Sequence, residues 1–195
     1  KVTDTTGSLN LSNVQTAVTL DGSVTITGLH SSVGTITTTA TKSVSVDANI
    51  ISGKTVTNAG TVNVTDLDND TGASNADLSS ITGGTINATW NGTDTFTGKL
   101  GTAALTVASG TMTIDSAATI SSASSLSVSS GATMSVSGTK ITSKTVGGSG
   151  TLEITGSAGS AIDLANITDT NLILQANIDD SATTLSNLKV NLDAA

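Results

Sequence analysis

Four aspartates are the residues whose types and spacing could do the most chemistry. Asp66, Asp68 and Asp70 alternate along the chain, and Asp77 follows the first of them by eleven positions. Ca²⁺ binds about six to eight oxygen atoms, and carboxylates on a tight loop can supply several of them. The sequence therefore predicts a weak calcium site at these residues, with Ca²⁺ as the cofactor to test. The alternative is an acidic turn whose carboxylates are solvated.

The same spacing resembles the calcium loops of EF-hand and dockerin type, with two departures. Those loops carry Gly at the sixth position, whereas Thr71 stands there in this chain and Gly72 comes one place late. No clear helical pattern flanks the stretch, apart from a short helical turn expected at residues 75–81. Both departures weaken the expected affinity for Ca²⁺.

A catalytic constellation is harder to find. His30 is the one histidine, Glu153 is the one glutamate, and the chain has neither Cys nor Arg. No serine lies in a nucleophile motif with a nearby base, so we expect that the protein is not an enzyme. Trp90 and Phe96 are the only large aromatic residues. They could stack on a sugar, or they could fill a bend in the fold, which leaves a carbohydrate-binding or carbohydrate-cleaving protein as the alternative function.

The elements that carry these residues follow a repeat. Residues 133–138 return as residues 151–156 at an offset of 18, with two apolar residues two apart and a closing Gly in each copy. Alternation of this kind indicates a strand, and the Gly indicates a turn. One such unit cannot bury its own apolar face, but stacked copies can. The repeat predicts an all-β fold, a parallel β-helix (β-solenoid).

The spacing of the copies sets the size of the solenoid. The chain predicts roughly nine rungs of about 18–22 residues each, in a single domain over residues 1–195. Val62 and Ile86 lie 24 residues apart, which predicts an acidic loop insertion near residues 66–80. Asn91-Gly92 is a turn signal. We expect five apolar pairs to point inward and stack in register: residues 24/26, 44/46, 62/64, 134/136 and 152/154.

Composition excludes several classes of protein. The formal net charge is −8 with seven scattered lysines, which argues against binding to nucleic acid and to anionic membrane surfaces. No stretch approaches the ~20 apolar residues that span a membrane, which argues against membrane insertion. The absence of Cys excludes disulfides. Hydrophobic residues make up 36% of the chain and keep their spacing, which argues against disorder.

The Gly-Thr-apolar-x-apolar ladder, residues 87–93 (Asn-Ala-Thr-Trp-Asn-Gly-Thr) and the Cys-free Ser/Thr/Gly bias resemble a class of bacterial protein. They look like the β-strand-repeat regions of large surface proteins, such as autotransporter passengers, filamentous-haemagglutinin-like adhesins and S-layer or fibre proteins. The resemblance implies a right-handed parallel β-helix, an extracellular or cell-surface location, and a stalk, adhesive or fibre-forming role. Surface glycans are a candidate partner to test.

The chain ends carry a further expectation. Strand-like apolar spacing continues to both termini, at Val2 and at Leu188, Val190 and Leu192, and the chain has no Pro. Unblocked strand edges are templates for pairing. We therefore expect end-to-end self-association, or continuation within a longer chain. The alternative is a monomer capped by a short helix starting near Asp180-Ser181.

Overall fold

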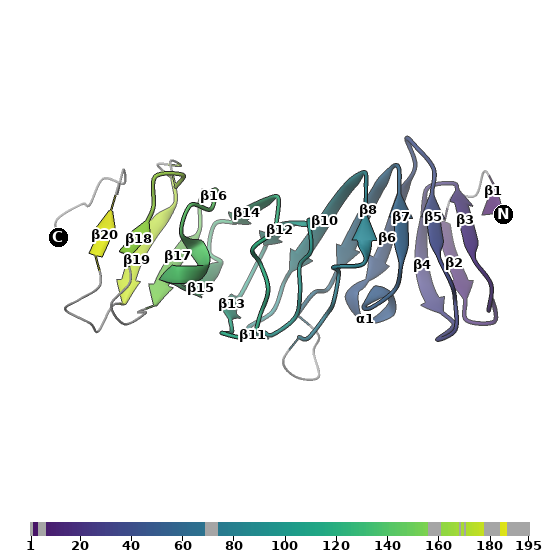
Figure 1. The fold of residues 1–195 in the computed structure, drawn as a ribbon, viewed down its shortest axis with the longest axis horizontal. Coiled ribbons are helices and arrows are strands. Elements are labelled where there is room, and N and C mark those ends of the chain that lie inside the picture. Colours follow the sequence, from purple (N-terminus) through teal and green to yellow (C-terminus); the bar gives the residue numbers. More distant parts are fainter. Residues whose placement is uncertain are drawn as a thin grey trace.

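The protein is an elongated stack of parallel strands in the computed structural model, which describes residues 2–3, 7–68, 74–155, 161–167, 169, 171–177 and 184–186. The first and last described strands, β1 (Val2–Thr3) and β20 (Thr184–Ser186), lie at opposite ends of the rod (Figure 1). About eight turns form a β-solenoid, one fewer than the sequence predicts, and the predicted fold class is confirmed. The capping helix expected near Asp180-Ser181 and the apolar residues 188, 190 and 192 lie outside the described residues.

Three main sheets run along the rod. The long sheet stacks eight strands in the order β16-β14-β12-β10-β8-β6-β4-β2. Its strands are β2 (Gly7–Leu11), β4 (Val24–Leu29), β6 (Ser43–Asp47), β8 (Thr61–Thr65), β10 (Thr85–Trp90), β12 (Ala104–Val107), β14 (Ser125–Val128) and β16 (Val146–Gly148).

Two shorter sheets each cover part of the length. The N-terminal sheet holds β1 (Val2–Thr3), β3 (Val18–Asp21), β5 (Ile36–Thr38), β7 (Val56–Asn58) and β9 (Ile81–Thr82). The C-terminal sheet holds β11 (Asp94–Phe96), β13 (Thr111–Ile114), β15 (Thr133–Ser137), β17 (Thr151–Thr155) and β19 (Ile173–Asn177). A small separate sheet pairs β18 (Ala161–Asp163) with β20 (Thr184–Ser186).

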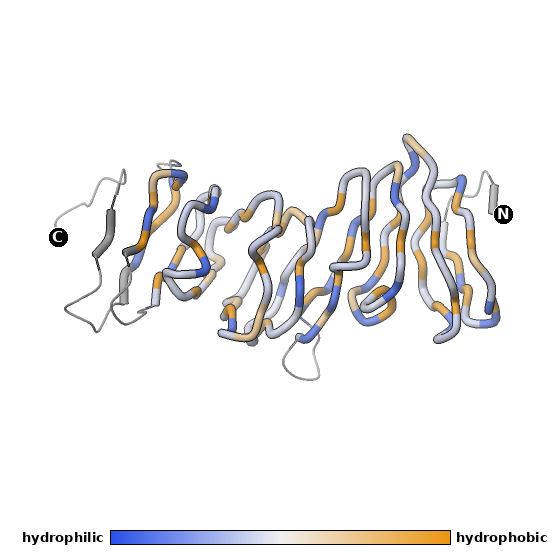
Figure 2. Tube along the Cα trace, viewed as in Figure 1, coloured by the Kyte–Doolittle hydropathy of each residue, from blue (hydrophilic) through white to orange (hydrophobic). Residues whose placement is uncertain are grey.

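The core is a set of apolar columns along the rod axis. Val24 pairs with Val44 and Val44 with Val62, in register. Met134 pairs with Leu152 and Val136 with Ile154 in the same way. All of the apolar pairs expected to point inward are at most 5% exposed, so that prediction is confirmed. Figure 2 shows the resulting alternation of hydrophobic and hydrophilic residues along the strands.

A column of β-turns closes the rungs on one side. In each turn a backbone carbonyl accepts the N–H three residues on, at 2.9–3.2 Å. The eight acceptors are the carbonyls of Leu11, His30, Ile51, Leu78, Leu100, Ile120, Ile141 and Leu164. Seven of these first positions are Leu or Ile and are buried. This second repeat, an apolar residue followed by two small or polar residues, is visible in the sequence but is separate from the strand repeat.

A longer repeat of 90 residues joins these elements. The helix α1 (Ala48–Ile51) returns as α2 (Gly138–Ile141), and the strands around it return at the same offset: β6, β7 and β8 as β15, β16 and β17. The sequence did not predict either helix. The two copies lie in different sheets, because β6 and β8 belong to the long sheet whereas β15 and β17 belong to the C-terminal sheet.

The two halves of the rod meet in one rung, which we call the changeover rung and define as residues 78–100. It contains β9, the last strand of the N-terminal sheet, then β10 of the long sheet, then β11, the first strand of the C-terminal sheet. It is thus the one rung within the described residues to which all three main sheets contribute a strand. Trp90 and Phe96 lie in it, both 0% exposed.

The acidic stretch enters this rung from the previous one. Thr61 pairs with Thr85, an offset of 24 residues, whereas Ser43 and Thr61 in the preceding pair are 18 residues apart. The acidic loop insertion near residues 66–80 stays a prediction, because residues 69–73 lie outside the described part of the chain. The helical turn expected at 75–81 is wrong: Ser74 and Asp77 instead form isolated parallel bridges with Phe96 and Lys99, and β9 begins at Ile81. Neighbouring rungs supply pairing partners for this segment, and these override its weak helical tendency.

Candidate functional site

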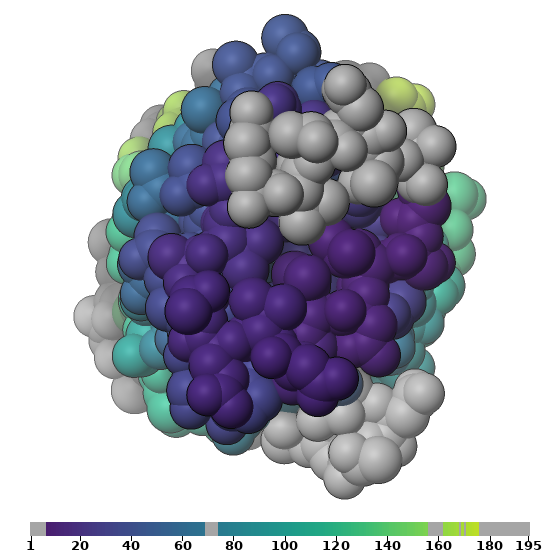
Figure 3. All heavy atoms as spheres, turned by 90° about the vertical axis from the view of Figure 1, so that its right-hand side faces the viewer, coloured from purple at the N-terminus to yellow at the C-terminus, as the bar shows by residue number. Residues whose placement is uncertain are grey.

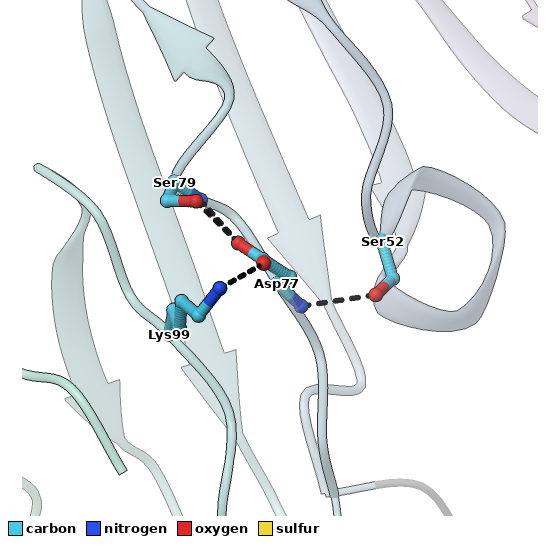
Figure 4. Close-up of polar contacts among 4 residues, drawn as sticks. All are labelled: Ser52, Asp77, Ser79 and Lys99. Carbon is cyan, nitrogen blue, oxygen red and sulfur yellow. Dashed lines mark hydrogen bonds and ion pairs between the residues drawn. The ribbon is translucent and has the colours of Figure 1, made fainter.

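Asp77 sits in a network that ties three rungs together (Figure 4). Its Oδ2 accepts from Lys99 Nζ at 2.9 Å, and its Oδ1 accepts from the Ser79 N–H at 3.0 Å and from Ser79 Oγ at 2.5 Å. Its own N–H donates to Ser52 Oγ at 2.9 Å. The hydrogen bond from the Ser79 hydroxyl, followed by that from Lys99, lowers the pKa of Asp77 to about 2. The carboxylate is therefore ionised and already hydrogen-bonded.

Asp68 has a different environment, although it comes from the same stretch. It is 5% exposed, and its Oδ1 accepts the Asn91 N–H at 3.1 Å. A Cβ placed on Gly92 would lie 2.2 Å from Asp68 Oδ2, so the carboxylate occupies the space that only Gly leaves open. Asp68 thus supports the Asn91-Gly92 turn of the changeover rung from below.

The remaining members of the predicted calcium site are less informative. Asp66 is half-buried, with a left-handed φ of 55°, and Asp70 lies outside the described residues. Within the part of the chain that the structure describes, no group of three or more His, Asp or Glu side chains could hold a metal ion. Calcium binding at Asp66, Asp68, Asp70 and Asp77 stays a prediction, with the Asp77 carboxylate engaged by Lys99 and Ser79.

The aromatic pair is part of the core. The rings of Trp90 and Phe96 meet edge to face, with centroids 6.4 Å apart and an interplanar angle of 89°. Trp90 Nε1 donates to the Gly92 carbonyl at 2.8 Å. Because neither ring is exposed, neither can stack on a sugar. Of the two roles considered for these residues, the structure supports filling the interior, at the rung where three sheets meet.

Four of the five lysines in the described residues reach back to the preceding rung. Lys54 Nζ donates to the Ser31 carbonyl at 2.7 Å, and Lys140 Nζ to the Ala118 carbonyl at 2.6 Å. Lys144 donates to the Ser121 carbonyl, and Lys99 to Asp77. A hollow of about 470 Å³ beside α2 is lined by residues 116–121 and by Lys140 and Lys144. Both lysines there are held by backbone carbonyls, and none of the described residues that line the hollow carries a carboxylate or an imidazole.

The two residues with most catalytic potential lie far apart. His30 follows β4, where its Nδ1 accepts the Ser32 N–H at 3.1 Å, and Glu153 lies in β17. These elements are in opposite halves of the rod (Figure 1). Sequence reasoning missed the Asp68–Asn91–Gly92 contact, for which the one signal was the Asn-Gly turn.

Comparison with protein-family models, with curated proteins and with solved structures finds no match to this chain. Among the described residues, no helix has the length and apolar character that crossing a membrane requires.

Proposed function

We propose that the protein is an extracellular structural or adhesive element, a rigid rod that spaces or polymerises. The observation that supports this best is the unbroken stack of eight parallel strands in the long sheet. Hydrogen bonds between neighbouring rungs run along the rod axis, so axial load is shared by many backbone bonds. At about 4.8 Å per strand the long sheet is roughly 40 Å long.

Self-association end to end is the second part of this proposal. A head-to-tail contact, in which the N-terminal end of one copy meets the C-terminal end of the next, does not close on itself in a straight rod and forms a filament. Figure 3 looks onto the N-terminal end of the rod, where residues near the chain start form much of the visible face. Within the described residues, β2 pairs with β4 alone and β19 with β17 alone. Continuation of the same stack within a longer chain would use the same edges.

Electron microscopy of the purified chain over a range of concentrations, with light scattering on the same samples, tests this proposal. Filaments that lengthen with concentration are the expected result. Particles that remain single rods at every concentration would remove the polymerising role and leave the spacing role. A sugar-binding role has no support from the aromatic pair, because both rings are buried.

A further inference from the structure

The Asn91-Gly92 turn brings together the groups needed for a spontaneous chemical modification of the chain. We propose that Asn91 is a self-modification site, which loses ammonia through a succinimide with Asp68 as general base and Ser109 as hydrogen-bond donor. This proposal is independent of the rod function. It concerns one peptide bond in the changeover rung, and the only co-reactant is solvent water.

The target side chain is free to react. Asn91 is exposed, and in the part of the chain that the structure describes its side-chain amide makes no hydrogen bond. Gly92 follows it without a side chain, so no Cβ of residue 92 hinders the backbone nitrogen that must approach the Asn91 side chain. This is the only Asn-Gly pair in the sequence.

A base lies against the attacking residue. Asp68 Oδ1 accepts the Asn91 N–H at 3.1 Å, which fixes the carboxylate under the turn. Its Oδ2 lies only 2.2 Å from the position of a Gly92 Cβ, and the attacking nitrogen is bonded to the same Cα. No hydrogen bond to Oδ2 occurs within the described residues. A buried carboxylate at this place is suited to take the Gly92 amide proton.

A donor polarises the peptide from the other side. Ser109 Oγ donates to the Asn91 carbonyl at 2.6 Å. When Gly92 N loses its proton, the negative charge is shared with this carbonyl oxygen, so the hydroxyl stabilises the anion that attacks. The Trp90 Nε1 hydrogen bond to the Gly92 carbonyl, at 2.8 Å, holds the far end of the turn.

The reaction balances with water alone. Gly92 N forms a bond to Asn91 Cγ, the bond from Cγ to the side-chain nitrogen breaks, and ammonia leaves with the proton that Asp68 took from Gly92. Water then opens the succinimide at either carbonyl, giving aspartate or isoaspartate at position 91. The product places a new negative charge next to the buried Asp68. Isoaspartate also lengthens the backbone within the changeover rung.

Incubation of the folded protein at neutral pH, followed by peptide mapping by mass spectrometry, tests the proposal. We expect the peptide containing Asn91 to gain the mass difference between an amide and a carboxylate, with isoaspartate among the products. The exposed Asn166, which precedes Ile167, is the internal control and should stay unchanged. A synthetic peptide of residues 87–95 gives the rate without the folded site.

Two variants separate the catalysed reaction from ordinary Asn-Gly chemistry. Asp68→Asn should slow the modification by at least about tenfold, because the general base is lost, and Ser109→Ala should slow it by a smaller factor. Circular dichroism checks that both variants remain folded, and the exposed position of the Ser109 contact makes Ser109→Ala the safer one. The proposal is overturned if the folded protein reacts no faster than the peptide, or if folded Asp68→Asn reacts at the unchanged rate.

Discussion

Two aspartates from one acidic stretch have different roles because their partners come from the next rung. Lys99 binds Asp77 from 22 residues away, and the Asn91 N–H binds Asp68 from 23 residues away. The alternation of carboxylates in the sequence predicts that they lie on one loop, but it carries no information about these partners. The sequence also does not decide whether Trp90 is buried, because a core role and a sugar-stacking role use the same type of residue.

The Asp77 network predicts a pH-dependent contribution to stability. The folded-state pKa of about 2 lies below the ordinary value of 3.8, so the stabilisation is present above the ordinary value and is lost as pH falls through 2. Because the carboxylate is 32% exposed, solvent screening reduces its contribution to the free energy of unfolding to about 1 kcal/mol. Asp77→Asn should lower the unfolding free energy by this amount at pH 7 in urea denaturation.

The difference between Asp77→Asn and the wild type should shrink as the pH falls below 4 and vanish only below pH 2, where the carboxylate is protonated in the folded protein as well. Lys99→Met is the matched control and should reproduce part of the loss at pH 7. An Asp77→Asn difference that is the same at pH 7 and pH 2 would contradict the assignment.

The sequence predicts how the strands pair, but it does not predict the short helices and the turns between them. The 18-residue offset between β15 and β17 predicts their register because alternating apolar residues on neighbouring rungs must share one interior. The helices α1 and α2 are only four residues each, too short for a helical period to show. The column of turns is hard to predict because its signal, one Leu or Ile per rung, is the same residue type that marks the buried positions of the strands.

Ile154 tests the importance of register. Its side chain is 0% exposed and pairs with Val136 below it and with the Ala176 position above it. Ile154→Ala should lower the unfolding free energy by roughly 2–5 kcal/mol, as for other buried large-to-small substitutions. Glu153→Ala, at the neighbouring half-buried position of the same strand, should cost under about 0.5 kcal/mol. Equal effects in urea denaturation would contradict the inward stacking.

The 90-residue repeat offers an experiment on turn geometry. Gly53 and Ser143 occupy the same place after α1 and α2, with left-handed φ values of 70° and 60°. Nothing lies within 4 Å of a Cβ on Gly53, so a substitution there tests backbone strain alone. Gly53→Ala should destabilise the protein by about 1 kcal/mol. Ser143→Gly should be stabilising by a few tenths to about 1 kcal/mol.

Thermal or urea unfolding of the two single variants measures both changes in stability. The expected signs are opposite because both turns require a conformation that Gly adopts without strain. If Ser143→Gly destabilised the protein by as much as Gly53→Ala, the left-handed turn would not be the feature that the two copies share.

For the whole molecule, the ends decide between a single rod and a filament. Ile173, in β19 at the edge of the C-terminal sheet, is 56% exposed, and it is the one large hydrophobic residue of the described chain that is exposed to this degree. Its register partner one rung inward is Thr151. The unpaired edge of a sheet is a template for pairing with another copy, and an apolar side chain on that edge adds to this tendency.

Ile173→Asp should therefore reduce association in light scattering, with a lower average mass at each protein concentration. Thr151→Asp places the same charge one rung further in and should leave association near the wild-type level. If both substitutions reduced association equally, net charge and not the apolar contact at β19 would be the cause.

The changeover rung also determines how a rod of this kind can vary in length. Each rung contacts only its neighbours, so duplicating one complete rung within a half, for example residues 104–124, would lengthen the protein by one step and leave both ends as they are. Ala104 and Ser125 are already register partners, so the copied strand would meet a matching neighbour on either side. A segment moved from the first half into the second would not match its new neighbours, because corresponding strands of the two halves, such as β6 and β15, belong to different sheets. Each half can therefore gain or lose complete rungs, whereas the changeover rung must be kept because it joins the two arrangements of sheets.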